Sequence, residues 1–240
     1  MVFITPFNMV ISGPSQAGKS SFVRNLIKDR ERLLHPYVER VIYVSKYGRE
    51  VADEAIEWLS EMPPISEELC NSLLVIDDAT YDCNQDVGHL FVRHSHHWNI
   101  SVVYIVQNLF ERRNPLLRTL SLNSHYTVFF KNPRDQSQIG YLARQMNPLH
   151  AKNIMKICEK IFGSTSRYVV FDFHQATPNC MRIKANLFGE NGVNHPLVYK
   201  YDEGDASDFI RHLTCQLTGG YGSSQYKNPT CKGREKKEKG

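Results

Sequence analysis

The sequence predicts an α/β fold built on a mainly parallel sheet with helices on both faces. Short apolar, β-branched runs recur at a spacing of roughly 25 to 33 residues, which is typical of β-α units. These runs are hydrophobic almost throughout instead of alternating, which favours strands covered by helices on both faces. The five runs cover residues 7–12, 40–45, 72–78, 101–107 and 126–131.

Helical periodicity fills the intervals between the runs. The expected helices cover residues 20–34, 50–62, 85–98 and 135–146. Beyond residue 148 the pattern changes to one more helix, at 149–161, and three strand candidates at 167–173, 180–188 and 198–202. We expect these last strands to extend the sheet or cap its edge. The predicted organisation is one domain over 1–205, followed by a C-terminal helix and a flexible basic tail over 206–240.

Composition is that of an ordinary globular protein, with 41% hydrophobic and 22% charged residues in a chain of 240. No apolar run approaches the roughly 20 residues that span a bilayer. The six cysteines contain no C-x-x-C pair, so a zinc site or a disulfide framework is not indicated. We therefore expect a soluble intracellular protein of the cytoplasm or nucleus, with no membrane partner. The net charge of +4 alone does not indicate nucleic-acid binding.

Residues 13–20, GPSQAGKS, match the phosphate-binding pattern G-x-x-x-x-G-K-[ST] in full. The pattern follows a predicted strand and opens a predicted helix, so backbone N–H groups and the helix N-terminus would both face the phosphates. Lys19 would bridge the β- and γ-phosphates of ATP, and the Ser20 hydroxyl would bind Mg²⁺. The expected nucleotide-binding residues are Gly13, Pro14, Ser15, Gln16, Ala17, Gly18, Lys19, Ser20 and Ser21.

Two carboxylates, Asp77 and Asp78, follow four apolar residues at the end of the third predicted strand. In an open α/β sheet, ligands bind at the carboxyl ends of the strands. Asp77 would hold the magnesium, and Asp78 would orient or deprotonate the attacking water. The alternative, two acids that end a strand and cap the next helix, is less favoured once the phosphate loop is present.

Gln107 ends the fourth predicted strand. If that strand lies between the phosphate-loop strand and the strand of Asp77, Gln107 stands beside the γ-phosphate and can contact the attacking water. Such an intervening strand marks the branch of P-loop ATPases that use a second catalytic carboxylate. The order of strands in the sheet is not contained in the chain order, so this placement is an analogy. A turn hydrogen bond at the strand end is the other role open to this amide.

Taken together, these segments resemble the genome-packaging ATPases of Maverick/Polinton elements and related DNA viruses. Those ATPases are relatives of the poxvirus packaging ATPase within the FtsK–HerA superfamily. The resemblance covers residues 8 to 188 and rests most on YIVQNLF and FKNPRD, within 101–146. It implies a RecA-like P-loop core that assembles as a ring, a hexamer, and pumps double-stranded DNA into a capsid. A capsid or portal protein, and association with the virion, follow from the same resemblance.

In such rings an arginine from the neighbouring subunit stabilises charge on the transferring phosphoryl group. The candidates after the fourth strand are Arg112, Arg113, Arg118 and Arg134, of which Arg118 and Arg134 are preferred. A solvated or ion-paired surface side chain is the alternative for each of them.

Two other functions fit a P-loop chain of this length: a small-molecule kinase, and an ATP-gated scaffold without efficient turnover. The carboxylate at Asp78 and the amide at Gln107 suit attack by water better than attack by a kinase substrate. Intact Lys19, Ser20, Asp77 and Asp78 argue against a scaffold. The histidines between His89 and His97 do not converge on one helix face, so a solvated face is favoured there over a metal site.

Overall fold

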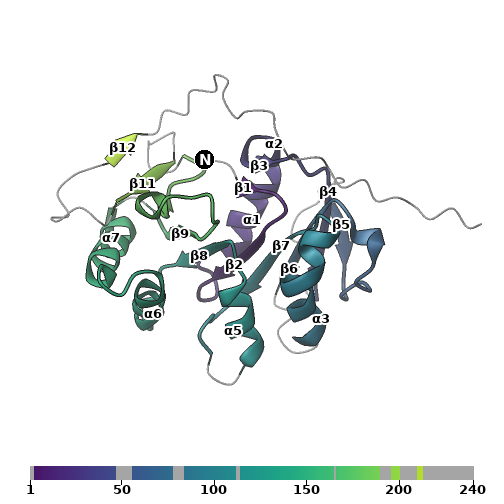
Figure 1. The fold of residues 1–240 in the computed structure, drawn as a ribbon, viewed down its shortest axis with the longest axis horizontal. Coiled ribbons are helices and arrows are strands. Elements are labelled where there is room, and N and C mark those ends of the chain that lie inside the picture. The colour runs from purple at the N-terminus through teal and green to yellow at the C-terminus, as the bar shows by residue number, and fades with distance from the viewer. Residues whose placement is uncertain are drawn as a thin grey trace, which may run out of the picture.

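A single large sheet runs through the protein and is covered by helices on both faces (Figure 1). The computed structural model describes residues 3–46, 56–77, 84–111, 114–164, 166–189, 196–200 and 210–212. Within these residues the large sheet has ten strands in the order β12-β11-β10-β9-β8-β2-β7-β6-β4-β5. Its strands are β2 (Asn8–Ser12), β4 (Arg40–Ser45), β5 (Ile56–Leu59), β6 (Ser72–Asp77), β7 (Ser101–Val106), β8 (Tyr126–Phe130), β9 (Tyr168–Asp172), β10 (Ile183–Ala185), β11 (Leu197–Tyr199) and β12 (Ile210–His212). A separate parallel pair joins β1 (Phe3–Ile4) to β3 (Leu34–His35).

The sheet divides into a parallel part and an antiparallel part at the boundary between β8 and β9. All pairings from β8 to β5 are parallel, and all pairings from β9 to β12 are antiparallel. The expected mainly parallel α/β sheet with extra C-terminal strands is therefore confirmed. Strand β7 lies between β2 and β6, as the analogy for Gln107 required.

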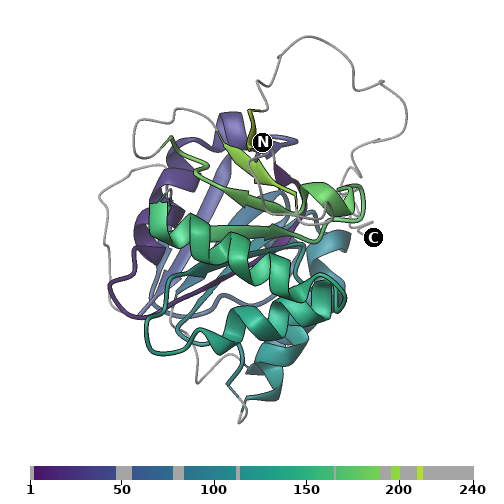
Figure 2. The same cartoon turned by 90° about the vertical axis from the view of Figure 1, so that its left-hand side faces the viewer.

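Two hydrophobic cores lie on opposite faces of the sheet. On one face pack α1 (Lys19–Lys28) and α2 (Arg30–Leu33), and α1 contributes Phe22, Val23, Leu26 and Ile27 at helical spacing. The other face carries α3 (Asn84–His89), a π-helical turn η2 (Leu90–His94), α4 (Ser95–His97), α5 (Pro115–Leu122), α6 (Ser137–Met146) and α7 (Ala151–Ser164). Figure 2 shows α6 and α7 lying side by side on this face, in mutual contact. Short 3-10 turns are η1 (Glu67–Leu69) and η3 (Asn179–Met181).

The helix predicted over 50–62 is wrong where the structure describes it. Ile56–Leu59 form β5, the edge strand of the parallel part, and Val41 of β4 pairs with Ile56. Pairing with β4 and burial of Ile56 outweigh the local helical periodicity in this segment.

Two other predictions need correction. The strand expected over 180–188 is shorter, because its first part is the turn η3 and only Ile183–Ala185 pair with β9 and β11. Helix α5 was not predicted at all. Asn114, whose side chain accepts a hydrogen bond from the N–H of Leu116, caps this helix, and Pro115 occupies its first turn.

The structure describes only part of the predicted C-terminal segment. Of the helix and tail expected over 206–240, the structure describes Ile210–His212, which form β12. No helix of the described residues is long and apolar enough to cross a membrane.

Candidate functional site

The phosphate-binding pattern forms a loop at the carboxyl end of β2, between the sheet and the first turn of α1. Gln16 (φ 62°) and Gly18 (φ 105°) both adopt left-handed backbone conformations, which let the loop curl back on itself. The N–H of Ala17 donates to the carbonyl oxygen of Pro14 at 3.2 Å, which closes this turn. Ser15 and Gln16 are exposed, and Ser20 is half-buried at the start of α1. Ser21, also on α1, is exposed and its hydroxyl accepts a hydrogen bond from Arg24 at 3.0 Å.

The loop is packed against the end of β8. A Cβ atom added to Gly13 would lie 2.6 Å from the Cβ of Phe130, which is closer than real side chains approach each other. Only glycine therefore fits at this position without a shift of the loop. Phe130 itself belongs to an aromatic cluster with Phe22 and Tyr168 beneath the loop.

Lys19 folds back over its own loop. Its Nζ atom donates hydrogen bonds to the carbonyl oxygens of Gly13 at 2.7 Å and Pro14 at 2.9 Å. These bonds keep the ammonium group at the mouth of the loop, where an incoming phosphate can replace the carbonyl oxygens as acceptor.

The register of the sheet brings the other predicted residues to the same edge. Ser12 of β2 pairs with Val106 of β7, and Ile105 of β7 pairs with Asp77 of β6. Gln107 follows Val106 directly and so lies level with Gly13, and its side chain is exposed. Strands β2 and β6 are two strand spacings apart, roughly 10 Å. The structure therefore places the phosphate loop, Gln107 and Asp77 along one edge, while Asp78 lies outside the described residues.

Asp77 has a partner that sequence analysis missed. The hydroxyl of Tyr43 on β4 donates to Oδ2 of Asp77 at 2.8 Å. Tyr43 pairs with Val75, so its side chain and that of Asp77 lie on the same face of the sheet. A tyrosine two residues before the end of a predicted strand was the available signal, but only the pairing of β4 with β6 gives it meaning.

The preferred arginine candidates lie on separate elements. Arg118 lies on α5 and Arg134 lies in the loop after β8, and both side chains are exposed. The N–H of Arg134 donates to Oδ1 of Asn132 at 3.1 Å, which fixes the backbone of that loop. Arg112 and Arg113 lie outside the described residues.

Among the residues that the structure describes, no group of three or more His, Cys, Asp or Glu side chains could hold a metal ion. His96 lies on α4, and its ring packs beside that of His125. Ser20 and Asp77 carry oxygen atoms, which are the ligand type that Mg²⁺ takes in proteins.

A histidine cluster lies at the opposite edge of the sheet. The ring of His125 lies 5.3 Å from that of His96 and 5.8 Å from that of His174. Nδ1 of His125 accepts a hydrogen bond from the N–H of Asn8 at 2.9 Å. Burial, together with the charges of the two neighbouring histidines, lowers the pKa of His125 to about 4. His125 is therefore neutral near pH 7.

A buried ion pair lies beside these histidines. Lys184, which is 8% exposed, donates to the carboxylate of Asp172, which is 2% exposed. Asp172 also accepts hydrogen bonds from the hydroxyl of Thr177 at 2.9 Å and from the N–H of His174 at 3.0 Å. This network joins β9 to β10 near the edge of the sheet opposite to the phosphate loop.

Comparison with known proteins does not identify a family for this chain. No protein-family model matches the chain, and no curated protein matches it. Among solved structures, it is similar to the cytoplasmic domain of the Type VII secretion ATPase EccC of Thermomonospora curvata, with a TM-score of 0.40 and 12% identity. The similarity covers 55% of this chain and only 20% of that one. Similarity at this level carries no functional argument, so the site has to be interpreted from its own geometry.

Proposed function

We propose that this chain is a P-loop ATPase that binds Mg·ATP at residues 13–20 and hydrolyses it at the edge formed by β2, β7 and β6. The observation that carries this proposal is the position of β7 between the other two strands. It sets Gln107 level with Gly13 and next to the strand that ends in Asp77. The same strand order supports the RecA-like core that the sequence resemblance implies.

The proposed roles of Lys19, Ser20, Asp77 and Gln107 follow from their positions, and that of Asp78 follows from its place in the sequence. Lys19 exchanges the carbonyl oxygens of its own loop for the β- and γ-phosphates. Ser20 and Asp77 hold the magnesium ion, which when bound neutralises charge on the phosphates. Asp78 accepts the proton of the attacking water, and Gln107 orients that water.

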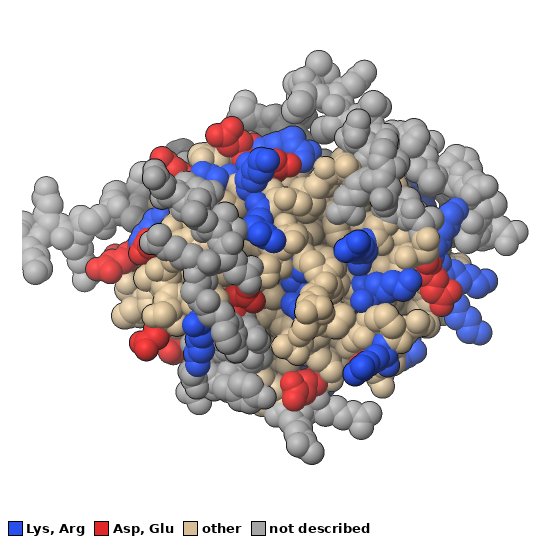
Figure 3. All heavy atoms as spheres, turned by 180° about the vertical axis from the view of Figure 1, so that it is seen from behind, with Lys and Arg blue, Asp and Glu red and all other residues tan. Residues whose placement is uncertain are grey.

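We further propose that hydrolysis drives the movement of double-stranded DNA during the packaging of a viral or transposon-viral genome. This step rests on the sequence resemblance and, more weakly, on surface charge. Lys and Arg side chains gather on the right-hand side of Figure 3, which is the side that carries α7. On α7 the exposed residues Lys152, Lys156 and Lys160 follow one another at intervals of four and so share one helix face. Such a face suits the phosphate backbone of DNA, which binds without regard to sequence.

The ring that this function requires would complete the site. Arg118 and Arg134 are exposed and lie on separate elements. Either one could reach the γ-phosphate of a neighbouring copy and stabilise charge there during hydrolysis. A capsid or portal protein would bind the assembled ring.

The test is ATP hydrolysis by the full chain with and without long double-stranded DNA, at two salt concentrations, with Lys19→Ala as the inactive control. We expect DNA to raise turnover and added salt to reduce that stimulation. Turnover that is indifferent to DNA would contradict the translocase. Phosphate transfer to a nucleoside would identify a kinase instead, and nucleotide binding without turnover would identify a scaffold.

A further inference from the structure

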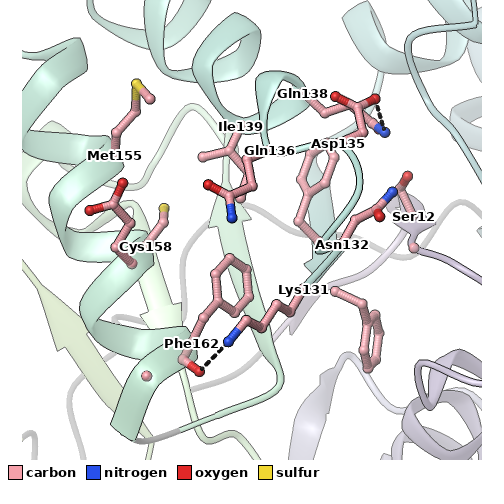
Figure 4. Close-up of a pocket in the computed structure, with 15 residues that line it drawn as sticks. Ser12, Lys131, Asn132, Asp135, Gln136, Gln138, Ile139, Met155, Cys158 and Phe162 are labelled. Carbon is pink, nitrogen blue, oxygen red and sulfur yellow. Dashed lines mark hydrogen bonds between the residues drawn. The ribbon is translucent and has the colours of Figure 1, made fainter.

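A cavity of about 170 Å³ opens beside the phosphate loop, on the face of the sheet that carries α6 and α7. It is bounded by the last residue of β2, the end of β8, the start of α6 and the second half of α7 (Figure 4). Sites that hold a whole drug-sized ligand measure roughly 300–1,000 Å³. This cavity is therefore sized for one part of a larger ligand.

The cavity is continuous with the phosphate loop. Ser12 and Gly13 line it, and Gly13 is also the first residue of that loop. Strand β8 lies on one side of β2, whereas β7 and β6 lie on the other. A nucleotide whose γ-phosphate points toward Gln107 and Asp77 must therefore extend its other end toward β8. The cavity lies at that end.

The walls suit a flat ring. Ile139, Met155 and Phe162 line the cavity, and Figure 4 shows Gln136 reaching between α6 and α7 among them. Cys158 completes this wall as an apolar group, because burial raises the pKa of its thiol to about 12. Apolar and aromatic side chains with a few placed polar groups are typical of small-molecule sites.

The polar part of the lining includes two side chains whose oxygen atoms are buried and unpaired. Nε2 of Gln138 donates to Oδ2 of Asp135 at 2.9 Å, and Asp135 stays a carboxylate because hydrogen bonds from Ser137 and Gln138 lower its pKa. A carboxylate only accepts, so the amide nitrogen of Gln138 must face Asp135 and Oε1 must face away from it. Gln138 is 5% exposed, and its Oε1 atom is buried without a hydrogen-bond partner. The hydroxyl oxygen of Ser12, a residue that is 1% exposed, is also buried without a hydrogen-bond partner.

Two unpaired buried polar atoms beside one cavity need a physical reason, because each costs free energy unless something pairs with it. A ligand N–H group in the cavity would satisfy either atom once the side chain that carries the atom turns toward the cavity.

We propose that this cavity binds the base of the nucleotide, and that Gln138 and Ser12 select adenine by its exocyclic amino group. The inference rests on the proposed function, since it assumes that the phosphates lie on residues 13–20. According to this inference, the specificity for ATP comes from residues at the end of β8 and on α6. The cavity lies on the face of the sheet opposite to the side chain of Asp77. A base in the cavity therefore does not compete with the magnesium ion.

The experiment is isothermal titration of the full chain with ATP, inosine triphosphate and inorganic tripolyphosphate, each with Mg²⁺. Inosine carries a carbonyl oxygen where adenosine carries the amino group, so it presents an acceptor to an acceptor. We expect ATP to bind roughly tenfold more tightly than inosine triphosphate. The variant Gln138→Met should lose this preference, and the matched control Gln145→Met, an exposed position on the same helix, should keep it. Tripolyphosphate should bind equally to all three proteins.

The outcomes separate the two proposals. Equal affinity of the unaltered chain for ATP and inosine triphosphate would overturn the base site, while tripolyphosphate binding would leave the phosphate loop standing. Retention of the preference in Gln138→Met would also overturn it. Failure of all three ligands to bind would overturn the proposed function, and the base site with it.

Discussion

The hydroxyl of Tyr43 donates a hydrogen bond to Oδ2 of Asp77 at 2.8 Å, which ties strand β4 to the carboxylate at the end of β6. Tyr43 is 3% exposed, and its ring packs on Trp58 of the edge strand with 4.5 Å between the ring centroids. This hydrogen bond holds one oxygen of Asp77, the carboxylate to which we assign the magnesium ion, in place. The edge strand β5 thus contributes to the site although it carries no residue of it.

Removal of the Tyr43 hydroxyl should raise the Mg²⁺ concentration that hydrolysis requires, with a smaller effect on nucleotide affinity. In Tyr43→Phe we expect the Mg²⁺ concentration for half-maximal hydrolysis to rise roughly tenfold, since a hydrogen bond to a charged group contributes about 1.5 kcal/mol or more. Titration of Mg²⁺ at saturating ATP measures this. Tyr37→Phe, at an exposed position, is the control. An unchanged magnesium requirement would mean that Tyr43 does not position Asp77.

The packing of Gly13 against Phe130 predicts a second effect. In Gly13→Ala the new Cβ meets the Cβ of Phe130 at 2.6 Å, so the loop must move away from its phosphate-binding geometry. We expect nucleotide affinity to fall by more than about tenfold while thermal stability changes far less. Gly140→Ala, on α6, brings its new Cβ no nearer than 3.5 Å to its neighbours and should bind nucleotide normally. Equal affinity of Gly13→Ala and the unaltered chain would contradict the loop geometry.

The buried ion pair predicts a large stability effect remote from the nucleotide site. Lys184→Met leaves the carboxylate of Asp172 buried without its cation, a change that costs about 3–5 kcal/mol in the free energy of unfolding. Urea denaturation measures this cost. Lys152→Met, at an exposed position on α7, should stay within about 0.5 kcal/mol. A loss of similar size in both variants would show that the pair is not buried in solution.

The histidine cluster makes stability depend on pH. The folded chain holds the pKa of His125 at about 4, below the ordinary value of 6.5, and the pKa of His96 is lowered too, mainly by burial. Between pH 6.5 and pH 4 the unfolded chain binds more protons than the folded chain. The free energy of unfolding therefore falls as pH drops from about 6.5 toward 4. Urea midpoints across this range measure the slope.

His125→Asn tests the origin of this pH dependence. An asparagine side chain does not titrate, and it offers an oxygen to the N–H of Asn8 in place of Nδ1. The variant should have a shallower slope between pH 6.5 and 4. The same slope in both proteins would assign the effect to other groups.

Much of the fold could be predicted because the parallel strands are buried on both faces and so are continuously apolar. Residues 40–45 were predicted to the residue, and the runs predicted over 72–78 and 101–107 each end one residue beyond the observed strand. Residues 56–59 were predicted as a helix because a half-exposed edge strand has no such run, and its pairing with β4 is a tertiary contact. Helix α5 was missed although Asn114 at the cap and Pro115 in the first turn are start signals.

The candidate site, like the fold, could be predicted from the sequence only in part. The glycines, Lys19 and Ser20 lie close together in the chain, so their spacing alone predicts a phosphate loop. The neighbourhood of Gln107 and Asp77 depends on strand order, which the structure supplies. Tyr43, Ser12 and Gln138 come from three separate elements, and no local pattern links them to the site. Asp78, outside the described residues, stays a prediction.

The most direct test of the central claim is phosphate release from Mg·ATP by the unaltered chain, Lys19→Ala, Asp78→Asn and the control Asp86→Asn, an exposed acid on α3. If the edge formed by β2, β7 and β6 is a hydrolytic site, the control retains turnover, Lys19→Ala loses it, and Asp78→Asn binds ATP but loses turnover by roughly a hundredfold or more. Undiminished turnover in Lys19→Ala or Asp78→Asn would contradict the assignment of ATP hydrolysis to this edge.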